Sequence, residues 1–137
     1  PFYPSKETLL VEADKERIVG VISNLLNNAI KFTKEGEIIV STEMKEDNNN
    51  NFYVLVSVKD NGMGLDPAIL PKIFSKFITK SFDGLGLGLF ISKNVVEAHG
   101  GKIWAENNTK NGNSGAVFYF TLPLLHNKKS SYNSIDK

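Results

Sequence analysis

Three glycines alternate with leucines in the stretch Asp83-Gly84-Leu85-Gly86-Leu87-Gly88-Leu89, directly before an apolar helical pattern. Glycine lets a backbone approach a ligand closely, and a helix N-terminus offers unpaired N–H groups and the positive end of the helix dipole. Together these features predict a loop that wraps phosphate groups. A tight turn uses the same residues, so the stretch indicates a nucleotide site only in combination with other motifs.

The residues after this stretch predict a helix and two strands. Apolar side chains recur from Leu87 to Ala98 at helical spacing, and Gly100-Gly101 is expected to end the helix. The β-type runs that follow are Lys102–Asn107 and Ala116–Pro123.

The first half of the chain predicts a longer helix between β-type runs. Asp14 is a suitable N-cap, apolar residues recur at helical spacing from Ile18, and the helix is expected to end near Thr33–Gly36. The other expected elements are the strands Leu9–Glu12, Glu37–Met44 and Phe52–Lys59, and a short helix opened by Asp66-Pro67 with Leu70, Ile73, Phe74 and Phe77 on one face. Antiparallel hairpins mixed with helices indicate an α+β fold, in which helices cover one face of a sheet.

Three polar residues share one stripe of the first helix. Asn24, Asn28 and Lys31 stand at positions i, i+4 and i+7, which places them within roughly 60° around the helix axis. Amide oxygens suit Mg²⁺, which usually shares its ligands with water and phosphate, and a lysine offers a point charge to phosphate. The alternative is a solvated polar face, which a single asparagine would favour.

A second polar motif follows a strand directly. In Asp60-Asn61-Gly62-Met63-Gly64, the aspartate can accept a hydrogen bond from an exocyclic amine such as that of adenine. The glycines let the backbone come close to a flat ring. An Asx-type turn that leaves the strand is the alternative interpretation.

The aromatic and histidine residues carry weaker signals. Phe74 and Phe77 are more typical of a core, although Phe77 could edge a pocket. His99 is best explained as a helix C-terminal residue favoured by the dipole, and His126 lies in a polar tail. No nucleophilic triad or metal-ligand cluster appears at a useful spacing.

Composition limits the class of protein. The chain has 137 residues, which suggests one domain over residues 1–125 with a polar tail at 126–137. Its net charge is +1 and it has no cysteine, so nothing in the composition favours nucleic acid or membrane partners, disulfides or thiolate chemistry. No apolar run approaches the length of a membrane span, and a cytoplasmic setting is expected. Because the chain opens on Pro1, we expect it to be a fragment of a longer protein.

Taken together, these segments resemble the four sequence boxes of sensor histidine kinases. The four boxes are represented by Asn24-Leu25-Leu26-Asn27-Asn28-Ala29-Ile30-Lys31-Phe32-Thr33, Asp60-Asn61-Gly62-Met63-Gly64, Ile73-Phe74-Ser75-Lys76-Phe77 and Gly84–Leu89. The endings Glu97-Ala98-His99-Gly100-Gly101-Lys102-Ile103-Trp104 and Phe118-Tyr119-Phe120-Thr121-Leu122-Pro123 are also similar to that family. Four boxes in order are far more specific than any one of them.

The resemblance implies the GHKL-type ATP-binding fold, with a mixed sheet of about five strands backed by three helices. It implies that ATP and Mg²⁺ bind between the first helix and a lid. Asn28 and Lys31 would be catalytic, and Asn28 with Asn24 would hold Mg²⁺. The residues expected around the nucleotide are Asn24, Asn28, Lys31, Phe32, Asp60, Gly62, Gly64, Phe77, Lys80, Gly84, Leu85, Gly86, Leu87, Gly88 and Leu89.

The departures from the family bear on activity. Relatives that hydrolyse ATP carry a glutamate one turn before the magnesium asparagine, where this chain has Asn24, so a kinase is favoured over an ATPase. The family often has a threonine where this chain has Leu85, and leucine lacks the hydroxyl group that could contact phosphate. The other alternative is therefore a nucleotide-binding module without transfer activity. The lid is short, and Lys80 or Lys76 is expected to carry its charge.

The acceptor of the phosphate is expected on another part of the protein. No histidine precedes the first box, so the phosphoacceptor histidine would belong to a dimerisation helical domain of the same kinase. That domain would pass the phosphate to a response regulator. We expect no nucleic-acid partner and no membrane contact by this domain.

Overall fold

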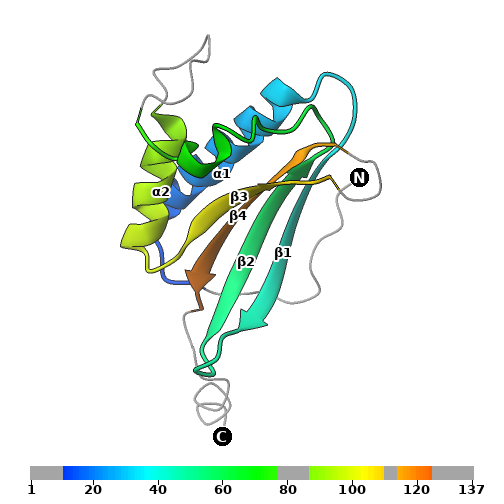
Figure 1. Ribbon diagram of the computed structural model, residues 1–137. Coiled ribbons are helices and arrows are strands. Elements are labelled where there is room, and N and C mark those ends of the chain that lie inside the picture. Colours follow the sequence, from blue (N-terminus) through cyan, green and yellow to red (C-terminus); the bar gives the residue numbers. More distant parts are fainter. Residues whose placement is uncertain (1–10, 77–86, 110–113, 125–137) are drawn as a thin grey trace, which may run out of the picture.

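The structure, a computed structural model, describes residues 11–76, 87–109 and 114–124. Its elements are α1 (Lys15–Phe32), β1 (Ile38–Glu46), β2 (Phe52–Asp60), the 3₁₀ turn η1 (Leu70–Lys72), α2 (Gly88–Ala98), β3 (Ile103–Asn107) and β4 (Ala116–Pro123). The strands form one antiparallel sheet in the order β1-β2-β4-β3. Figure 1 shows α1 and α2 on one face of this sheet, which confirms the predicted α+β two-layer sandwich.

The core lies between the two helices and the central strands. The residues of β4 alternate, so that Phe118 and Phe120 face the helices, opposite Val58 and Val56 of β2. From α1 the core receives Val21, Leu25 and Ala29, the buried stripe that the helical spacing predicted. Phe118 and Phe120 are among the largest fully buried side chains, and the sheet therefore supplies much of the core volume.

The capping of α1 agrees with the sequence. Asp14 is the N-cap, and its side chain accepts a hydrogen bond from the backbone N–H of Arg17 at 3.3 Å. The helix ends at Phe32 and Thr33 is its C-cap, within the range expected for its end. The two caps define where α1 begins and ends, so they define which residues share one side of the helix.

The structure differs from the sequence prediction in several elements. The described strands are all antiparallel, whereas a mixed sheet of about five strands was expected, and residues 11 and 12 of the predicted strand are not part of the sheet. The predicted helix after Asp66-Pro67 is only the turn η1, in which Pro71 has no N–H to continue a helical ladder. Two α-helices are therefore present in the described residues, in place of three helices.

The described helices show no membrane span. None of them combines the length and the apolar character that crossing a bilayer requires.

Candidate functional site

Asn24 reaches from the middle of α1 to the start of α2. Its Nδ2 donates to the carbonyl oxygen of Gly88 at 3.3 Å and to the hydroxyl oxygen of Ser92 at 3.1 Å. A carbonyl oxygen can only accept, so the amide nitrogen must be the atom that faces α2. The amide oxygen takes part in neither contact and is left to accept a hydrogen bond or bind a cation.

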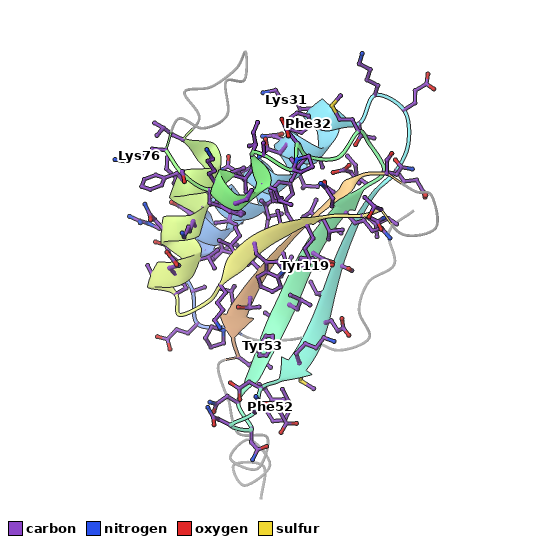
Figure 2. The ribbon with its side chains drawn as sticks, in the orientation of Figure 1. Lys31, Phe32, Phe52, Tyr53, Lys76 and Tyr119 are labelled. Carbon is purple, nitrogen blue, oxygen red and sulfur yellow. The ribbon has the colours of Figure 1, made fainter. Side chains whose placement is uncertain are left out.

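Asn28 and Lys31 continue the polar stripe toward the end of α1. The side chain of Asn28 is half-buried and forms no hydrogen bond with any described residue, whereas Lys31 is exposed in the last turn. Figure 2 shows Lys31 and Phe32 at this end of the helix. The helix therefore presents two amide groups and one ammonium group along one side, as their spacing predicted.

These amide oxygens fit a hard divalent cation that shares its ligands with phosphate. The described residues contain no group of three or more His, Cys, Asp or Glu side chains that could hold a metal ion. A cation at the stripe would therefore bind the oxygens of Asn24 and Asn28 and complete its shell with water and phosphate oxygens. The fixed orientation of Asn24 supports this fit, because its nitrogen already has partners.

Asp60 is a buried carboxylate at the end of β2. It is only 3% exposed, and its Oδ1 accepts hydrogen bonds from the backbone N–H groups of Gly62 at 2.9 Å and Ala116 at 3.3 Å. Its Oδ2 has no hydrogen-bond partner in the described part of the chain. One oxygen therefore fixes the carboxylate, and the other can accept from a ligand amine.

The loop after Asp60 lies directly against the end of α1. A Cβ on Gly62 would meet the carbonyl oxygen of Phe32 at 2.1 Å and Oγ1 of Thr33 at 2.9 Å, so only glycine fits there. Met63 N–H also donates to the Phe32 carbonyl at 3.4 Å. From the sequence, the glycines of this loop were expected to let the backbone approach a ligand ring. The structure shows that Gly62 is also required because the backbone at the end of α1 leaves no room for a Cβ.

Two residues that the sequence analysis missed hold this loop in place. Asn107 at the end of β3 accepts from Leu65 N–H at 2.7 Å and donates to its carbonyl at 2.8 Å. Ser114 donates to the carbonyl of Gly62 at 2.8 Å. Their polar side chains next to predicted strands were the feature of the sequence that could have indicated this role. The contacts themselves depend on the tertiary fold.

The glycine-rich stretch is described only in part. Phe77, Lys80, Gly84, Leu85 and Gly86 lie outside the described residues. Leu87 is the N-cap position of α2, Gly88 begins the helix, and the side chain of Leu89 is 6% exposed and belongs to the core. Any role of Leu89 at the site therefore falls to its backbone.

The aromatic residues near α2 agree with a structural role. The Phe74 ring packs edge-on against Phe118, with centroids 6.2 Å apart. Lys76, one candidate for the lid charge, has its Nζ 5.1 Å from the ring centroid of Phe90 on α2, and Figure 2 shows it beside that helix. Lys76 thus contacts a residue of α2 through its ammonium group.

His99 is occupied on both sides of its ring. Nε2 accepts from the backbone N–H of Asp14 at 3.0 Å, and Nδ1 lies 2.7 Å from the carbonyl oxygen of Val95, which requires an N–H at Nδ1. The ring therefore ties the start of α1 to the end of α2. This arrangement agrees with the structural role expected for His99.

Those predicted residues that the structure describes lie at one end of the molecule. Figure 1 shows the C-terminal end of α1, the start of α2 and the end of β2 together at the top of the view. A cavity of about 490 Å³ at the other end of the sheet is lined by residues that include Tyr53, Lys102 and Trp104, and by none of the predicted residues. The polar groups of α1, α2 and β2 are therefore the candidate site, and this cavity is separate from them.

Comparison with known proteins identifies the family. Residues 13–126 match the family model described as histidine kinase-, DNA gyrase B-, and HSP90-like ATPase. The chain is 38% identical over 125 residues to hybrid signal transduction histidine kinase C of Dictyostelium discoideum, covering 85% of this chain and 10% of that protein. It is 33% identical over 132 residues to sensor histidine kinase WalK of Bacillus subtilis, covering 91% of this chain and 21% of the relative. The chain thus spans about a tenth to a fifth of these relatives.

Solved structures agree with this result. The nucleotide-free catalytic domain of histidine kinase ThkA is 40% identical, with a TM-score of 0.68, covering 82% of this chain and 70% of that one. Full-length ShkA, solved in complex with AMPPNP, is 30% identical with a TM-score of 0.70, covering 85% of this chain and 23% of that one. The chain therefore belongs to the family of histidine kinase-, DNA gyrase B- and HSP90-like ATPases, as a catalytic domain of the sensor histidine kinase type.

Proposed function

We propose that this chain binds ATP at the end formed by α1, the loop after Asp60 and the start of α2, and transfers its γ-phosphate to a histidine on a separate helical domain. The observation that carries the proposal is the carboxylate of Asp60, which is buried, fixed through Oδ1 and left with Oδ2 to accept. An amino group on a flat base is the complement of such an acceptor. The AMPPNP complex of the similar kinase ShkA supports a nucleotide at this fold.

The phosphate groups would lie along the polar stripe of α1. Asn28 and Asn24 would hold Mg²⁺ through their amide oxygens, and Lys31 would contact phosphate. Bound Mg²⁺ supplies positive charge that offsets the charge of the phosphates. The backbone around Gly84, Gly86 and Gly88 would complete the site, since N–H groups at the start of a helix bind phosphate oxygens well.

Transfer to a protein acceptor is favoured over hydrolysis. An amide such as Asn24 cannot take a proton from water, and its nitrogen is already bound to Gly88 and Ser92. The residues of this chain would therefore bind and orient the triphosphate without activating water. Catalysis would consist of positioning and of charge stabilisation, as is usual in phosphoryl transfer.

The acceptor and the later partners would belong to the rest of the protein. The chain has two histidines, and His99 has both ring nitrogens engaged. The phosphoacceptor would be a histidine on the dimerisation helices of the same kinase, followed by an aspartate of a response regulator. The domain would work in the cytoplasm, where ATP is available.

A transfer assay tests this function. The chain is incubated with γ-labelled ATP and Mg²⁺, with and without a purified helical domain of the same kinase that carries the acceptor histidine. Label is expected on the helical domain alone, as an acid-labile and base-stable phosphohistidine. Steady release of free phosphate without any labelled protein would instead favour an ATPase.

A further inference from the structure

Ser92 is a buried polar residue in a helix face that otherwise belongs to the core. Its exposed fraction is 0%, and together with Asp60 it makes up the buried polar or charged residues of the described chain. Val95 and Val96 on the same helix are buried and apolar. A hydroxyl in such surroundings costs free energy unless it is hydrogen-bonded, so its partner is informative.

The partner of Ser92 is a predicted magnesium ligand. Nδ2 of Asn24 donates to Ser92 Oγ at 3.1 Å, across 68 positions of the sequence, and to the Gly88 carbonyl at 3.3 Å. The Gly88 carbonyl can only accept, so it selects the nitrogen side of the amide, and the Ser92 hydroxyl accepts a second hydrogen bond from the same nitrogen. A flipped amide would place Oδ1 against the Gly88 carbonyl oxygen, which is unfavourable.

We propose that Ser92 is a positioning residue, which holds the amide of Asn24 so that its oxygen faces the divalent cation of the bound nucleotide. This inference rests on the proposed function, because it assumes the cation between Asn24, Asn28 and phosphate. Ser92 itself touches neither the cation nor the nucleotide. It acts by accepting from the amide nitrogen beside the Gly88 carbonyl, which holds the side chain of Asn24 in place.

The same contact connects the cation site to the end of the glycine-rich stretch. Gly88 is the first residue of α2, and a Cβ there would lie 3.6 Å from Oδ1 of Asn24. Asn24 thus lies against the backbone at the start of the helix and against the side chain one turn later. A change in the position of this helix start would move the side chain of Asn24, and it would thereby change the contact between Asn24 and the cation.

The test compares nucleotide affinity with and without Mg²⁺. ATP binding to the wild type, Ser92→Ala and Ser92→Cys is measured by calorimetry in EDTA and in saturating Mg²⁺. Loss of one hydrogen bond should weaken binding in Mg²⁺ by about 2- to 12-fold and leave binding in EDTA unchanged. Ser92→Cys keeps the size of the side chain but offers only a weakly accepting sulfur, so it separates the hydrogen bond from packing.

Val96→Ala is the matched control for destabilisation. Val96 is also fully buried on α2, and its truncation should lower the melting temperature without changing the ratio of the two affinities. A nucleotide-free readout is the side-chain NH₂ resonance of Asn24, which should shift in both Ser92 variants and not in Val96→Ala.

The outcomes separate this inference from the proposed function. Unchanged Mg²⁺ dependence in Ser92→Ala and Ser92→Cys, with ATP still bound, would show that Ser92 is only structural. A wild-type chain that binds no ATP in either buffer would overturn the proposed function and the positioning role with it. A shifted Asn24 resonance together with a weaker Mg²⁺-dependent complex would support both.

Discussion

Replacing Asp60 with asparagine changes one ligand-facing atom and leaves the internal contacts of the side chain possible. The amide oxygen of Asp60→Asn can still accept from the N–H groups of Gly62 and Ala116, which Oδ1 binds at 2.9 and 3.3 Å. The amide nitrogen then takes the place of Oδ2. An acceptor for the adenine amine thereby becomes a donor, while the shape of the side chain is kept.

The magnitude follows from the change in hydrogen bonding. Hydrogen bonds to a charged group contribute about 1.5–3 kcal/mol and neutral ones about 0.5–1.5 kcal/mol, so each of the two internal hydrogen bonds should weaken by roughly 1–1.5 kcal/mol. At the ligand, two donors would face each other in a site where Asp60 is only 3% exposed. An unsatisfied buried group costs about 1–3 kcal/mol, which corresponds to roughly 5- to 150-fold weaker binding of ATP.

The assay pairs calorimetry with thermal melting for the wild type and Asp60→Asn. Inosine triphosphate carries a carbonyl oxygen where adenine has its amine, so the variant should discriminate less against it than the wild type does. Melting shows whether the variant, which should melt at a lower temperature, is still folded at the temperature of the titration. If a folded Asp60→Asn variant binds ATP as tightly as the wild type, with the same preference over inosine triphosphate, the assignment of Asp60 is wrong.

The other predictions concern stability and activity. Gly62→Ala should unfold the domain or lower its melting temperature strongly, because the new Cβ would lie 2.1 Å from the Phe32 carbonyl oxygen. The control Gly88→Ala should fold normally, because its new Cβ has no contact closer than 3.6 Å. If the two variants melted at the same temperature, the clash at Gly62 would be contradicted. The backbone N–H of Asn51 donates to Asp47 and lowers the pKa of its carboxyl group from the ordinary value of 3.8. The stability lost in Asp47→Ala should therefore be greatest at neutral pH and should shrink as the pH falls below 3.8. Urea unfolding of both proteins from about pH 3 to 7 checks this, and a stability difference that does not change with pH would count against it. The isolated chain should neither label itself with γ-phosphate nor hydrolyse ATP above the buffer rate, and a steady-state turnover would contradict the kinase interpretation.

Local sequence rules predicted the helices and strands well. Asp14 caps α1, and the apolar spacing from Ile18 placed Val21 and Leu25 in the core, because both features depend on residues within one helix. Every strand predicted after residue 36 is present, although β1 ends at Glu46 rather than Met44. The predicted strand Ala116–Pro123 is β4, in which buried and half-buried residues alternate from Phe118 onward.

The errors arose where tertiary context decides. The residues after Asp66-Pro67 carry a helix start signal, and Asp66 does accept from Ala68 N–H at 2.9 Å, but only one 3₁₀ turn follows. Pro71 removes a donor from that ladder, and Ile73 is buried in the core after the turn. The pattern of apolar residues alone could not show that packing ends the turn so early.

Candidate residues for the site could be named from the sequence, but the contacts that support them could not. Spacing alone placed Asn24, Asn28 and Lys31 on one stripe of α1, which the helix bears out. That Asn24 binds Ser92, and that Asn107 holds the loop after Asp60, depends on pairs far apart in the sequence. No local rule predicts such pairs, because they exist only once the sheet and helices have packed.

Calorimetric titration of ATP into the wild-type chain, in Mg²⁺ and in EDTA, tests the central claim most directly. The account predicts one saturable site per chain, tighter in Mg²⁺ because the oxygens of Asn24 and Asn28 then share a cation with phosphate. It also predicts much weaker binding of inosine triphosphate, since Asp60 presents an acceptor. Absence of any saturable heat with ATP in either buffer, from a chain shown to be folded, would contradict the account.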